Sequence, residues 1–228
     1  MMCLNSNQTS VSVHKLRKTY DGRNYVLDGI ELELYPGDMA VIEGKSGSGK
    51  STLLNIIGLL DDYDEGEMFI CGKRVEHNQH GITEAIRAER IGFVFQAYHL
   101  VEMLTVKENV MLPFLYCKMP LDAAVRQRFD EIVESLQLTS LIEKRASLLS
   151  GGEKQRVAIA RAIIKEPDII IADEPTGNLD FENTKMVVDV FRKLRKTGKT
   201  VLMVTHDTKI ATAEDKRFRI QGGKLLRC

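Results

Sequence analysis

The sequence predicts an α/β fold with a mainly parallel sheet, on the strength of three observations. Gly44 and Gly49 bracket four residues and are followed at once by Lys50 and Ser51. A short apolar run precedes this loop and an apolar helical pattern follows it, which is a strand–loop–helix unit. Further along, a continuous apolar run ends in two carboxylates, as buried parallel strands do when their carboxyl ends open on a site.

The glycine-rich loop has the spacing of a phosphate-binding loop. Glycines let the backbone N–H groups turn inward and admit a phosphate chain without a Cβ in the way. Lys50 would bring a positive charge to the terminal phosphates, and the Ser51 hydroxyl would ligate Mg²⁺. A chance glycine-rich turn is the competing interpretation, which the strand before and the helix after the loop disfavour. The residues expected to hold the nucleotide phosphates are Gly44, Lys45, Ser46, Gly47, Ser48, Gly49, Lys50, Ser51 and Thr52.

Bulk composition narrows the possible functions. The 228 residues, 43% hydrophobic, suffice for one substantial core and a small subdomain. With 32 basic and 32 acidic residues the net charge is zero, so nothing favours nucleic acid as a partner. The four cysteines form no C-x-x-C pair, which favours reduced thiols. No apolar run reaches the roughly 18 to 20 residues that span a bilayer, and no signal peptide is recognisable, so we expect a soluble protein whose membrane role needs a partner.

The stretch before the loop is expected to form antiparallel strands. Residues 11–16 and 30–34 alternate apolar and polar residues, and a turn is expected at residues 36–38. Tyr20 lies in a turn-like segment, where its ring would either stack on a nucleotide base or pack as an ordinary tyrosine.

The middle of the chain changes from strands to helices. One short strand is expected over residues 66–75, and another over 91–96 that ends at Gln96. This glutamine would either position a metal or water, or simply cap a loop. Helical spacing over 121–138 then indicates an inserted helical segment of about forty residues.

A second glycine pair opens the next helix. Leu149-Ser-Gly-Gly-Glu153 precedes a helix expected over about 154–165, and Ser150, Gly151 and Gly152 could form a second anion-binding nest. Taken alone, this pattern is more typical of a simple N-cap.

Two later strands contribute candidate catalytic groups. The apolar strand over 168–174 ends in Asp173, which could hold the hydration shell of Mg²⁺, and Glu174, which could reach an attacking water. A solvated strand end is the competing interpretation. The strand over 200–205 ends at His206, either a structural histidine or one beside the γ-phosphate, and residues 217–227 are expected to form a hairpin.

Together these motifs resemble, over nearly the whole chain, the ATP-binding subunit of ATP-binding cassette (ABC) transporters. The resemblance rests on the phosphate loop, Gln96, the signature Leu149-Ser-Gly-Gly-Glu153, the strand ending at Glu174, the D-loop residue Asp180 and His206. It implies a P-loop NTPase (RecA-like) core with an N-terminal antiparallel β subdomain and an inserted α-helical subdomain. The whole chain, 1–228, would be one ABC ATP-binding domain, with the core at about 1–95 and 155–228 and the helical subdomain at about 97–153.

The resemblance also implies a mechanism. Two copies would close head to tail as a homodimer on ATP, each ATP lying between Lys50 of one copy and Ser150, Gly151 and Gly152 of the other. The implied catalytic residues are Glu174, which would polarise water, His206, which would hold water and γ-phosphate in line, and Gln96. The metal, Mg²⁺, would be held by Ser51, Gln96 and Asp173, while Tyr20 would stack on adenine and Asp180 would contact the nucleotide site.

Within the family, three segments look most like the lipoprotein-releasing and macrolide-export group (LolD/MacB-type). They are Ala172 to Asp180, Leu149 to Ala158 and Phe95 to Leu100. This implies an integral membrane permease partner with four helices and a large extracytoplasmic domain, and a peripheral place at the cytoplasmic face of the inner membrane. A regulatory cassette of the cell-division type, signalling to cell-wall hydrolases, is the alternative, whereas a ribosome- or DNA-acting cassette would need a longer chain. The transported molecule and the permease cannot be identified from these residues.

Two residues depart from the family pattern, and one segment is expected to dock the partner. Glu153 replaces the glutamine of many members, without expected loss of activity, and Ala146 replaces a usual proline, which should loosen the approach to the signature. The docking surface is expected on residues 96–115, where Tyr98, His99, Leu100, Met103 and Leu104 would be exposed; alternatively these residues fill the helical core.

Overall fold

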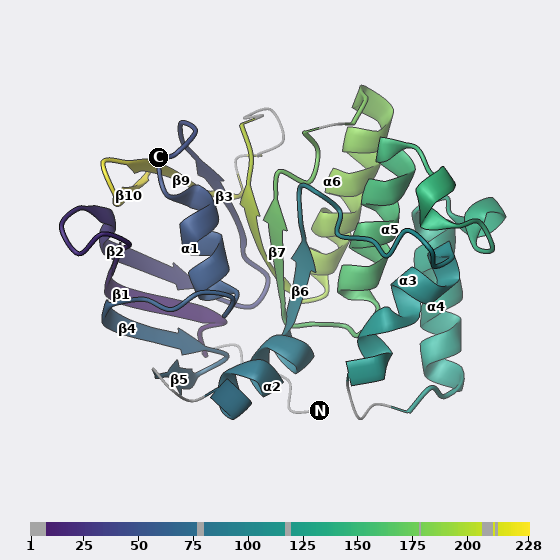
Figure 1. Ribbon diagram of the computed structural model, residues 1–228, viewed down its shortest axis with the longest axis horizontal. Helices are drawn as coiled ribbons and strands as arrows, with labels where there is room; N and C mark the ends of the chain where they lie inside the picture. Colours follow the sequence, from purple (N-terminus) through teal and green to yellow (C-terminus); the bar gives the residue numbers. More distant parts are fainter. Residues whose placement is uncertain (1–7, 77–79, 117–119, 178, 207–211, 213) are drawn as a thin grey trace.

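The computed structural model describes residues 8–76, 80–116, 120–177, 179–206, 212 and 214–228. Asn178, within the segment Ala172 to Asp180, and two of the four cysteines, Cys3 and Cys117, therefore lie outside the described residues. Cys71 and Cys228 are free thiols. Two sheets and a group of helices make up the described part of the chain (Figure 1).

The larger sheet has the strand order β10-β9-β3-β8-β7-β6. Its neighbouring strands pair in parallel from β9 to β6, and only the β9–β10 hairpin is antiparallel. The strands are β3 (Met39–Glu43), β6 (Ile91–Val94), β7 (Ile169–Asp173), β8 (Thr200–Val204), β9 (Lys216–Gln221) and β10 (Lys224–Arg227). Because parallel strands end at one edge of the sheet, the segments after β3, β6, β7 and β8 gather there.

The smaller sheet is antiparallel, with the order β2-β1-β4-β5. Its register pairs Val11 of β1 with Leu34 on one side and Ile70 on the other. The strands are β1 (Val11–Thr19), β2 (Tyr25–Leu34), β4 (Glu65–Ile70) and β5 (Lys73–Val75). The predicted antiparallel strands ahead of the phosphate loop are therefore confirmed.

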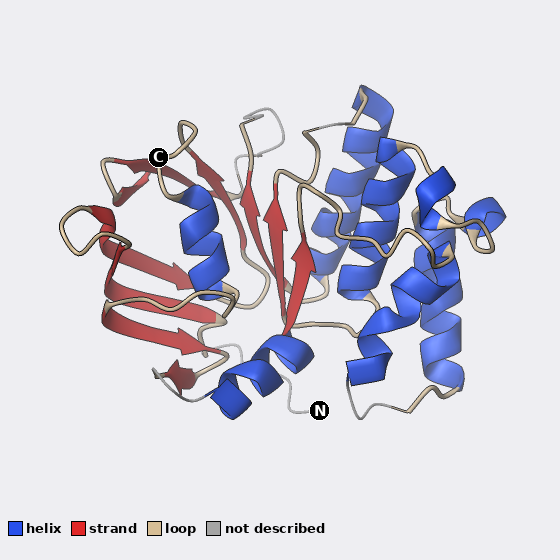
Figure 2. Cartoon of the chain, viewed as in Figure 1, coloured by secondary structure: helices blue, strands red, loops and turns tan. Residues whose placement is uncertain are grey.

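Most helices follow β6 in the chain and gather on one side of the molecule, as Figure 2 shows. The α-helices are α1 (Lys50–Ile57), α2 (His80–Arg90), α3 (Val106–Met111), α4 (Ala123–Ser135), α5 (Gly151–Ile163) and α6 (Phe181–Lys196). Three short 3₁₀ helices accompany them: η1 (Leu112–Tyr116), η2 (Thr139–Leu141) and η3 (Ala146–Leu148). Among the described residues, no helix combines the length and the apolar character that a membrane crossing requires.

Two hydrophobic cores flank the parallel sheet. Side chains alternate across a strand, so Met39 and Val41 of β3 join the core under α3, α4, α5 and α6. Ala40 and Ile42 join the core that α1 shares with the antiparallel sheet. Helix α1 is thus held between two sheets (Figure 1), and the loop before it inherits a fixed position.

Two expectations needed correction. The single strand expected over 66–75 is a hairpin of β4 and β5, because Cys71 and Gly72 both take positive φ, 49° and 72°, and turn the chain back. Helix α2 was not predicted, although its polar residues surround a buried Ile86.

Candidate nucleotide-binding site

The glycine loop joins β3 to α1 at the edge where the parallel strands end. Gly49 precedes the helix with φ 98°, a value that favours glycine, and a Cβ there would lie 3.0 Å from the Leu27 side chain and the Val26 carbonyl oxygen. No side chain caps the start of α1. Its first N–H groups therefore lack a side-chain acceptor, and these groups with the helix dipole form an anion-binding arrangement.

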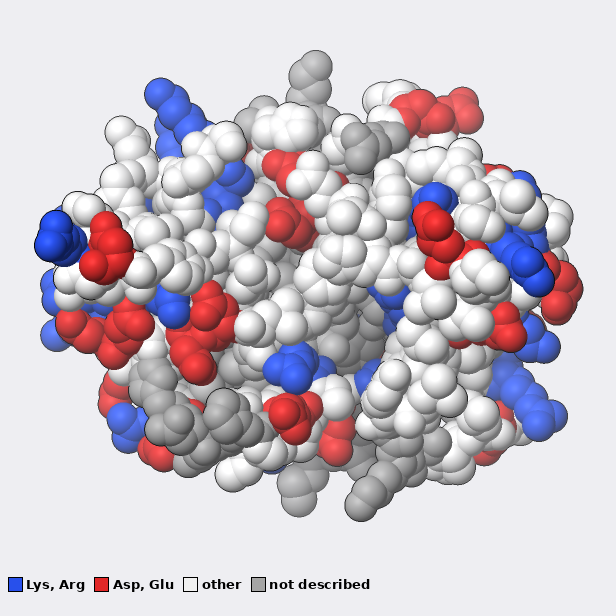
Figure 3. All heavy atoms as spheres, in the orientation of Figure 1, with Lys and Arg blue, Asp and Glu red and all other residues white. Residues whose placement is uncertain are grey.

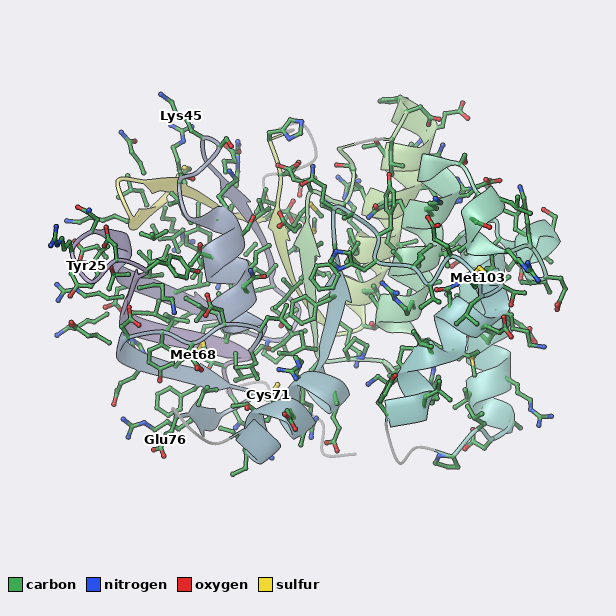
Figure 4. All side chains as sticks on the ribbon, in the orientation of Figure 1. Tyr25, Lys45, Met68, Cys71, Glu76 and Met103 are labelled. Carbon is green, nitrogen blue, oxygen red and sulfur yellow. The ribbon has the colours of Figure 1, made fainter. Side chains whose placement is uncertain are left out.

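Lys50 bends back over this loop. Its Nζ donates to the carbonyl oxygens of Gly44 and Lys45, both at 2.9 Å. The Ser48 hydroxyl below it has no partner among the described residues, and a Cβ on Gly44 would lie 2.7 Å from the Ser48 Oγ. Lys45, labelled in Figure 4, points away from the loop into solvent. The loop thus holds the Lys50 ammonium where a phosphate chain would lie. Position 44 requires glycine, because a Cβ there would lie too close to the Ser48 hydroxyl.

Ser51 and Asp173 meet across the site. The Ser51 hydroxyl donates to Asp173 Oδ2 at 3.0 Å, joining the start of α1 to the end of β7. Burial raises the pKa of Asp173, against the opposing hydrogen bond from Ser51. Two oxygen ligands suit Mg²⁺, which takes few ligands from the protein and keeps waters and phosphate oxygens for the rest. The pair therefore fits Mg²⁺ that is bound together with a nucleotide. The described residues hold no cluster of three or more His, Cys, Asp or Glu side chains fit for a metal.

Glu174 and His206 form a direct contact. His206 Nδ1 lies 2.8 Å from Glu174 Oε2, and the peptide N–H of His206 donates to the same oxygen at 3.4 Å. Glu174 takes φ 47°, the left-handed region that non-glycine residues rarely adopt and that is often found at functional sites. Its side chain is 13% exposed, against 70% for His206. The pair offers a carboxylate able to accept a proton from water and a histidine able to orient it.

One cavity of about 500 Å³ brings these groups together. The phosphate loop, the end of β7 and the second residue after β8 all contribute to its wall. Gln96, exposed just beyond β6, lies in the same wall, in line with one of the two sequence interpretations. The lining residues are Val26, Gly44, Ser46, Gly47, Gly49, Lys50, Ser51, Thr52, Gln96, Asp173, Glu174 and His206.

The signature residues lie outside this cavity. Ser150 is the N-cap of α5: its Oγ accepts from Glu153 N, and Glu153 Oε2 accepts from Ser150 N at 2.7 Å, a complete capping box. The hydrogen bond from the Ser150 backbone lowers the pKa of Glu153. The departure from glutamine at 153 thus supplies a charged cap, which suits a helix N-terminus.

Asp180 lies beside the signature. It caps α6 by accepting from Asn183 N at 2.8 Å, and a Cβ on Gly152 would lie 3.5 Å from Leu179 and 3.7 Å from Asn183. Asp180, Ser150, Gly151 and Gly152 are thus grouped with one another, and none of them lines the phosphate cavity of its own chain.

The approach to the signature is held firmly, contrary to the expectation of a loose one. Ala146 is buried, and its peptide N–H, which a proline would lack, donates to the Leu104 carbonyl oxygen at 2.9 Å. The N–H of Ser147 donates to the Glu102 carbonyl oxygen at 3.1 Å. The alanine therefore ties the signature to the segment that follows Gln96.

Tyr20 also lies outside the cavity lining, but it is connected to it. The residue is 63% exposed, its hydroxyl donates to Asp61 Oδ2 at 2.7 Å, and Lys18 Nζ lies 5.0 Å from the ring centroid. Burial raises the pKa of Tyr20, as does the bond to Asp61, while a hydrogen bond with Thr52 opposes them. Thr52 lines the cavity, so the phenol lies at its margin.

Sequence reasoning missed some residues of this region. Val26, at the start of β2, lines the cavity and packs beside Gly49, but an apolar residue in a strand carries no sign of this role. The contact between Glu174 and His206 was equally hidden, because it depends on the pairing of β7 with β8.

A parallel sheet with a phosphate loop at a helix N-terminus, oxygen ligands for Mg²⁺ and a carboxylate beside it defines a P-loop nucleoside triphosphatase. Residues 27–177 match the ABC transporter family, and the chain belongs to that family as an ATP-hydrolysing cassette.

Several relatives are similar over most of this chain. It is 42% identical over 201 residues to the lipoprotein-releasing system ATP-binding protein LolD of Aquifex aeolicus, covering 88% of this chain and 89% of the relative. It is 38% identical to the macrolide export ATP-binding/permease protein MacB of Pasteurella multocida, covering 96% of this chain but 34% of that longer protein. A dimeric ATP-binding cassette solved in a post-hydrolysis state with ADP and Pi is 37% identical, with a TM-score of 0.87 and coverage of 94% of this chain and 96% of that one.

Proposed function

We propose that this cassette binds MgATP between two head-to-tail copies and drives a membrane permease of the lipoprotein-releasing and macrolide-export group. One observation carries the proposal. The cavity of each chain holds the phosphate loop, Ser51, Asp173, Glu174 and His206, whereas Ser150 and its glycines are grouped outside it. A site completed by the signature of a second copy accounts for this separation. The dimer seen in the related cassette with ADP and Pi supports it.

Within one chain, the roles follow from position. Ser51 and Asp173 would hold Mg²⁺, which neutralises charge on the phosphates, and Gln96 lies in the same wall. Lys50 would meet the terminal phosphates. Glu174 would accept the proton of the attacking water, and His206 would orient the water after leaving its contact with that carboxylate.

The domain organisation proposed with this function is a single ATP-binding domain. Its core would comprise about residues 1–95 and 155–228, with the helical subdomain at about 97–153. The succession of α3, η1, α4, η2 and η3 between β6 and α5 supports that division.

The experiment that tests the function is Glu174→Gln. The variant should bind ATP but hydrolyse it about 10² to 10⁴ times more slowly, because the general base is lost while the shape is kept. Glu131→Gln, an exposed position on α4, is the matched control and should keep full activity. Equal ATPase rates for the two variants would contradict the role given to Glu174.

A permease with four transmembrane helices and a large extracytoplasmic domain is the partner we propose, with the cassette at the cytoplasmic face of the inner membrane. The similarity to LolD and MacB supports this proposal. A regulatory cassette of the cell-division type remains the second candidate, and the identity of a co-purified permease separates the two. On the face drawn in Figure 3, basic and acidic side chains are interspersed, in keeping with a partner other than nucleic acid.

The proposed docking surface lies on residues 96–115, and the structure divides this segment. Met103 is 73% exposed on the helical side of the face, far from Tyr25 and Lys45 in Figure 4, and Val101 is exposed as well. Leu100 packs against the core and Tyr98 lies beside Gly151, so these two residues serve the fold in addition. Substitution of Met103 is therefore the most direct test of the docking surface.

Met103→Glu should abolish co-purification with the permease while melting temperature and basal ATPase stay unchanged, because an exposed methionine tolerates a charge unless a partner covers it. Leu226→Glu, exposed on β10, is the control and should co-purify normally. Normal co-purification of Met103→Glu would place the docking surface elsewhere.

A further inference from the structure

The β1–β2 hairpin carries two tyrosines that are held in the same way. Tyr20 donates to Asp61, and Lys18 lies over its ring; Tyr25 donates to Glu65 at 2.9 Å, and Arg17 lies 5.3 Å from its ring centroid. Each ring thus has a carboxylate at its hydroxyl and a cation near one face. The two arrangements differ in what lies next to them.

Tyr25 leads to the cavity wall through the backbone of its neighbour Val26, whereas the Tyr20 arrangement is joined to the phosphate site by side chains. Its phenol interacts with Thr52, which lines the cavity, whereas the groups that act on the Tyr25 phenol are Glu65, Arg17 and Asp28. Thr52 is in the first turn of α1, and Asp61 follows the C-terminal end of that helix. The hydroxyl of Tyr20 is therefore fixed to the helix that starts at the phosphate loop.

Asp61 is itself well anchored. Its Oδ1 accepts from Lys18 Nζ at 3.3 Å and from the Asp62 peptide N–H at 2.8 Å, which leaves Oδ2 for the tyrosine. Partial burial raises the pKa of Asp61, but the bonds from Tyr20 and Lys18 outweigh it and lower the pKa overall, so the carboxylate is charged at neutral pH. The ammonium of Lys18 lies over one face of the Tyr20 ring, and the Lys18 side chain is only 9% exposed. Tyr20 itself remains 63% exposed to solvent.

We infer that Asp61 and Lys18 are positioning residues that hold the Tyr20 ring as a fixed platform for the base of the nucleotide. The inference rests on the proposed stacking of Tyr20 and adds what orients it. A free tyrosine would lose rotamer freedom when a base stacks on it, whereas a ring already held at its hydroxyl and on one side loses little. The stacking platform is thus organised before the nucleotide arrives.

The test compares ATP with inorganic tripolyphosphate, which has the phosphate chain and no base, by titration of the full chain in EDTA. Asp61→Ala should weaken ATP binding by roughly fivefold, the size of one net hydrogen bond, and leave tripolyphosphate binding unchanged. Tyr20→Ala should weaken ATP by about tenfold, and adding Asp61→Ala to it should cost nothing more. Asp61→Asn, which keeps an oxygen acceptor, should restore most of the affinity.

The matched control is Glu65→Ala, which removes the equivalent carboxylate from Tyr25 and should leave both affinities unchanged. Weaker tripolyphosphate binding by Asp61→Ala would overturn the inference, because the residue would then serve the phosphate loop. If Asp61→Ala binds ATP normally while Tyr20→Ala binds it more weakly, the positioning role of Asp61 is overturned but the stacking role of Tyr20 is not. Unchanged ATP binding by Tyr20→Ala would overturn the stacking role as well, and an effect confined to Glu65→Ala would move the platform to Tyr25.

Discussion

Two helix N-termini in this molecule are built for anions in opposite ways. Helix α1 begins after a left-handed Gly49 with no side chain capping it, and the ammonium of its first residue, Lys50, donates to backbone carbonyls of the loop. Helix α5 begins at Ser150 with a complete capping box from Glu153. One N-terminus leaves its donors for a ligand, while the other has satisfied part of its donors with its own side chains.

Their surroundings differ as well. The α1 side chains Leu53, Leu54, Ile56 and Ile57 are buried between two sheets, so the phosphate loop is fixed in place. Ser150 is exposed, outside the cavity of its own chain. We therefore propose that the first N-terminus binds phosphate within its own chain, whereas the second contacts phosphate only when another molecule brings it.

The test with the largest expected effect on ATPase activity mixes two inactive variants. Ser150→Arg damages the exposed N-terminus and Lys50→Ala the enclosed one, and each should hydrolyse ATP at a small fraction of the normal rate. In a mixed dimer one site carries both lesions and the other carries neither, so part of the ATPase activity should return. Steady-state ATPase against mixing ratio is the measurement. Absence of recovery despite demonstrated mixed dimers would mean that the two N-termini act within one chain or that both sites must work together.

A smaller effect is expected at the capping box. Glu153→Ala should lower the free energy of unfolding by about 0.5–2 kcal/mol, the usual range for losing a helix cap, and Glu153→Gln should lose less because it can still accept from Ser150 N. The lowered pKa of Glu153 means that its contribution is present above the unfolded pKa and lost as pH falls through the folded one. Urea unfolding at neutral and acidic pH checks both points, and a Glu153→Ala variant as stable as the wild type would show that the cap contributes nothing.

The smallest expected effect is a gain in stability, opposite in sign to the loss expected at the capping box. Because the pKa of Asp173 is raised, its contribution to stability is present below the unfolded pKa and lost as pH rises through the folded one, so the ionised carboxylate carries a cost at neutral pH. Asp173→Asn should therefore raise the melting temperature of the nucleotide-free chain by about 1–3 °C. With MgATP present the wild type should become the more stable of the two. A lower melting temperature for the variant without nucleotide would contradict this account.

Much of the parallel sheet could be predicted from sequence because its strands are continuous apolar runs with polar residues directly after them. The strands β3, β7 and β8 were found in this way, whereas the antiparallel β1 and β2 were found from the alternation of apolar and polar residues. Helix boundaries were less accurate: α5 begins at Gly151, a few residues before the expected start, because the capping box draws both glycines into the first turn. Helix α2 was missed, although Ile82, Ala85 and Ile86 have the spacing of one helix face.

The residues of the candidate site also fall into two groups, those that the sequence identifies and those that it does not. The phosphate loop, Asp173 and Glu174 are identified by local spacing, which a single sequence contains. The contact of His206 with Glu174 and the hydrogen bond between Asp61 and Tyr20 join residues 32 and 41 positions apart. Such pairs depend on strand order and helix placement, which the local pattern does not specify.

The hydrogen bonds of Ala146 and Ser147 have a mechanical consequence. They fasten the chain just before the signature to the carbonyls of Leu104 and Glu102, on either side of the exposed Met103. These two bonds are a direct backbone connection between the segment around Met103 and the residues just before Ser150. If a permease covers Met103, as proposed, we expect this connection to couple the position of the permease to that of Ser150.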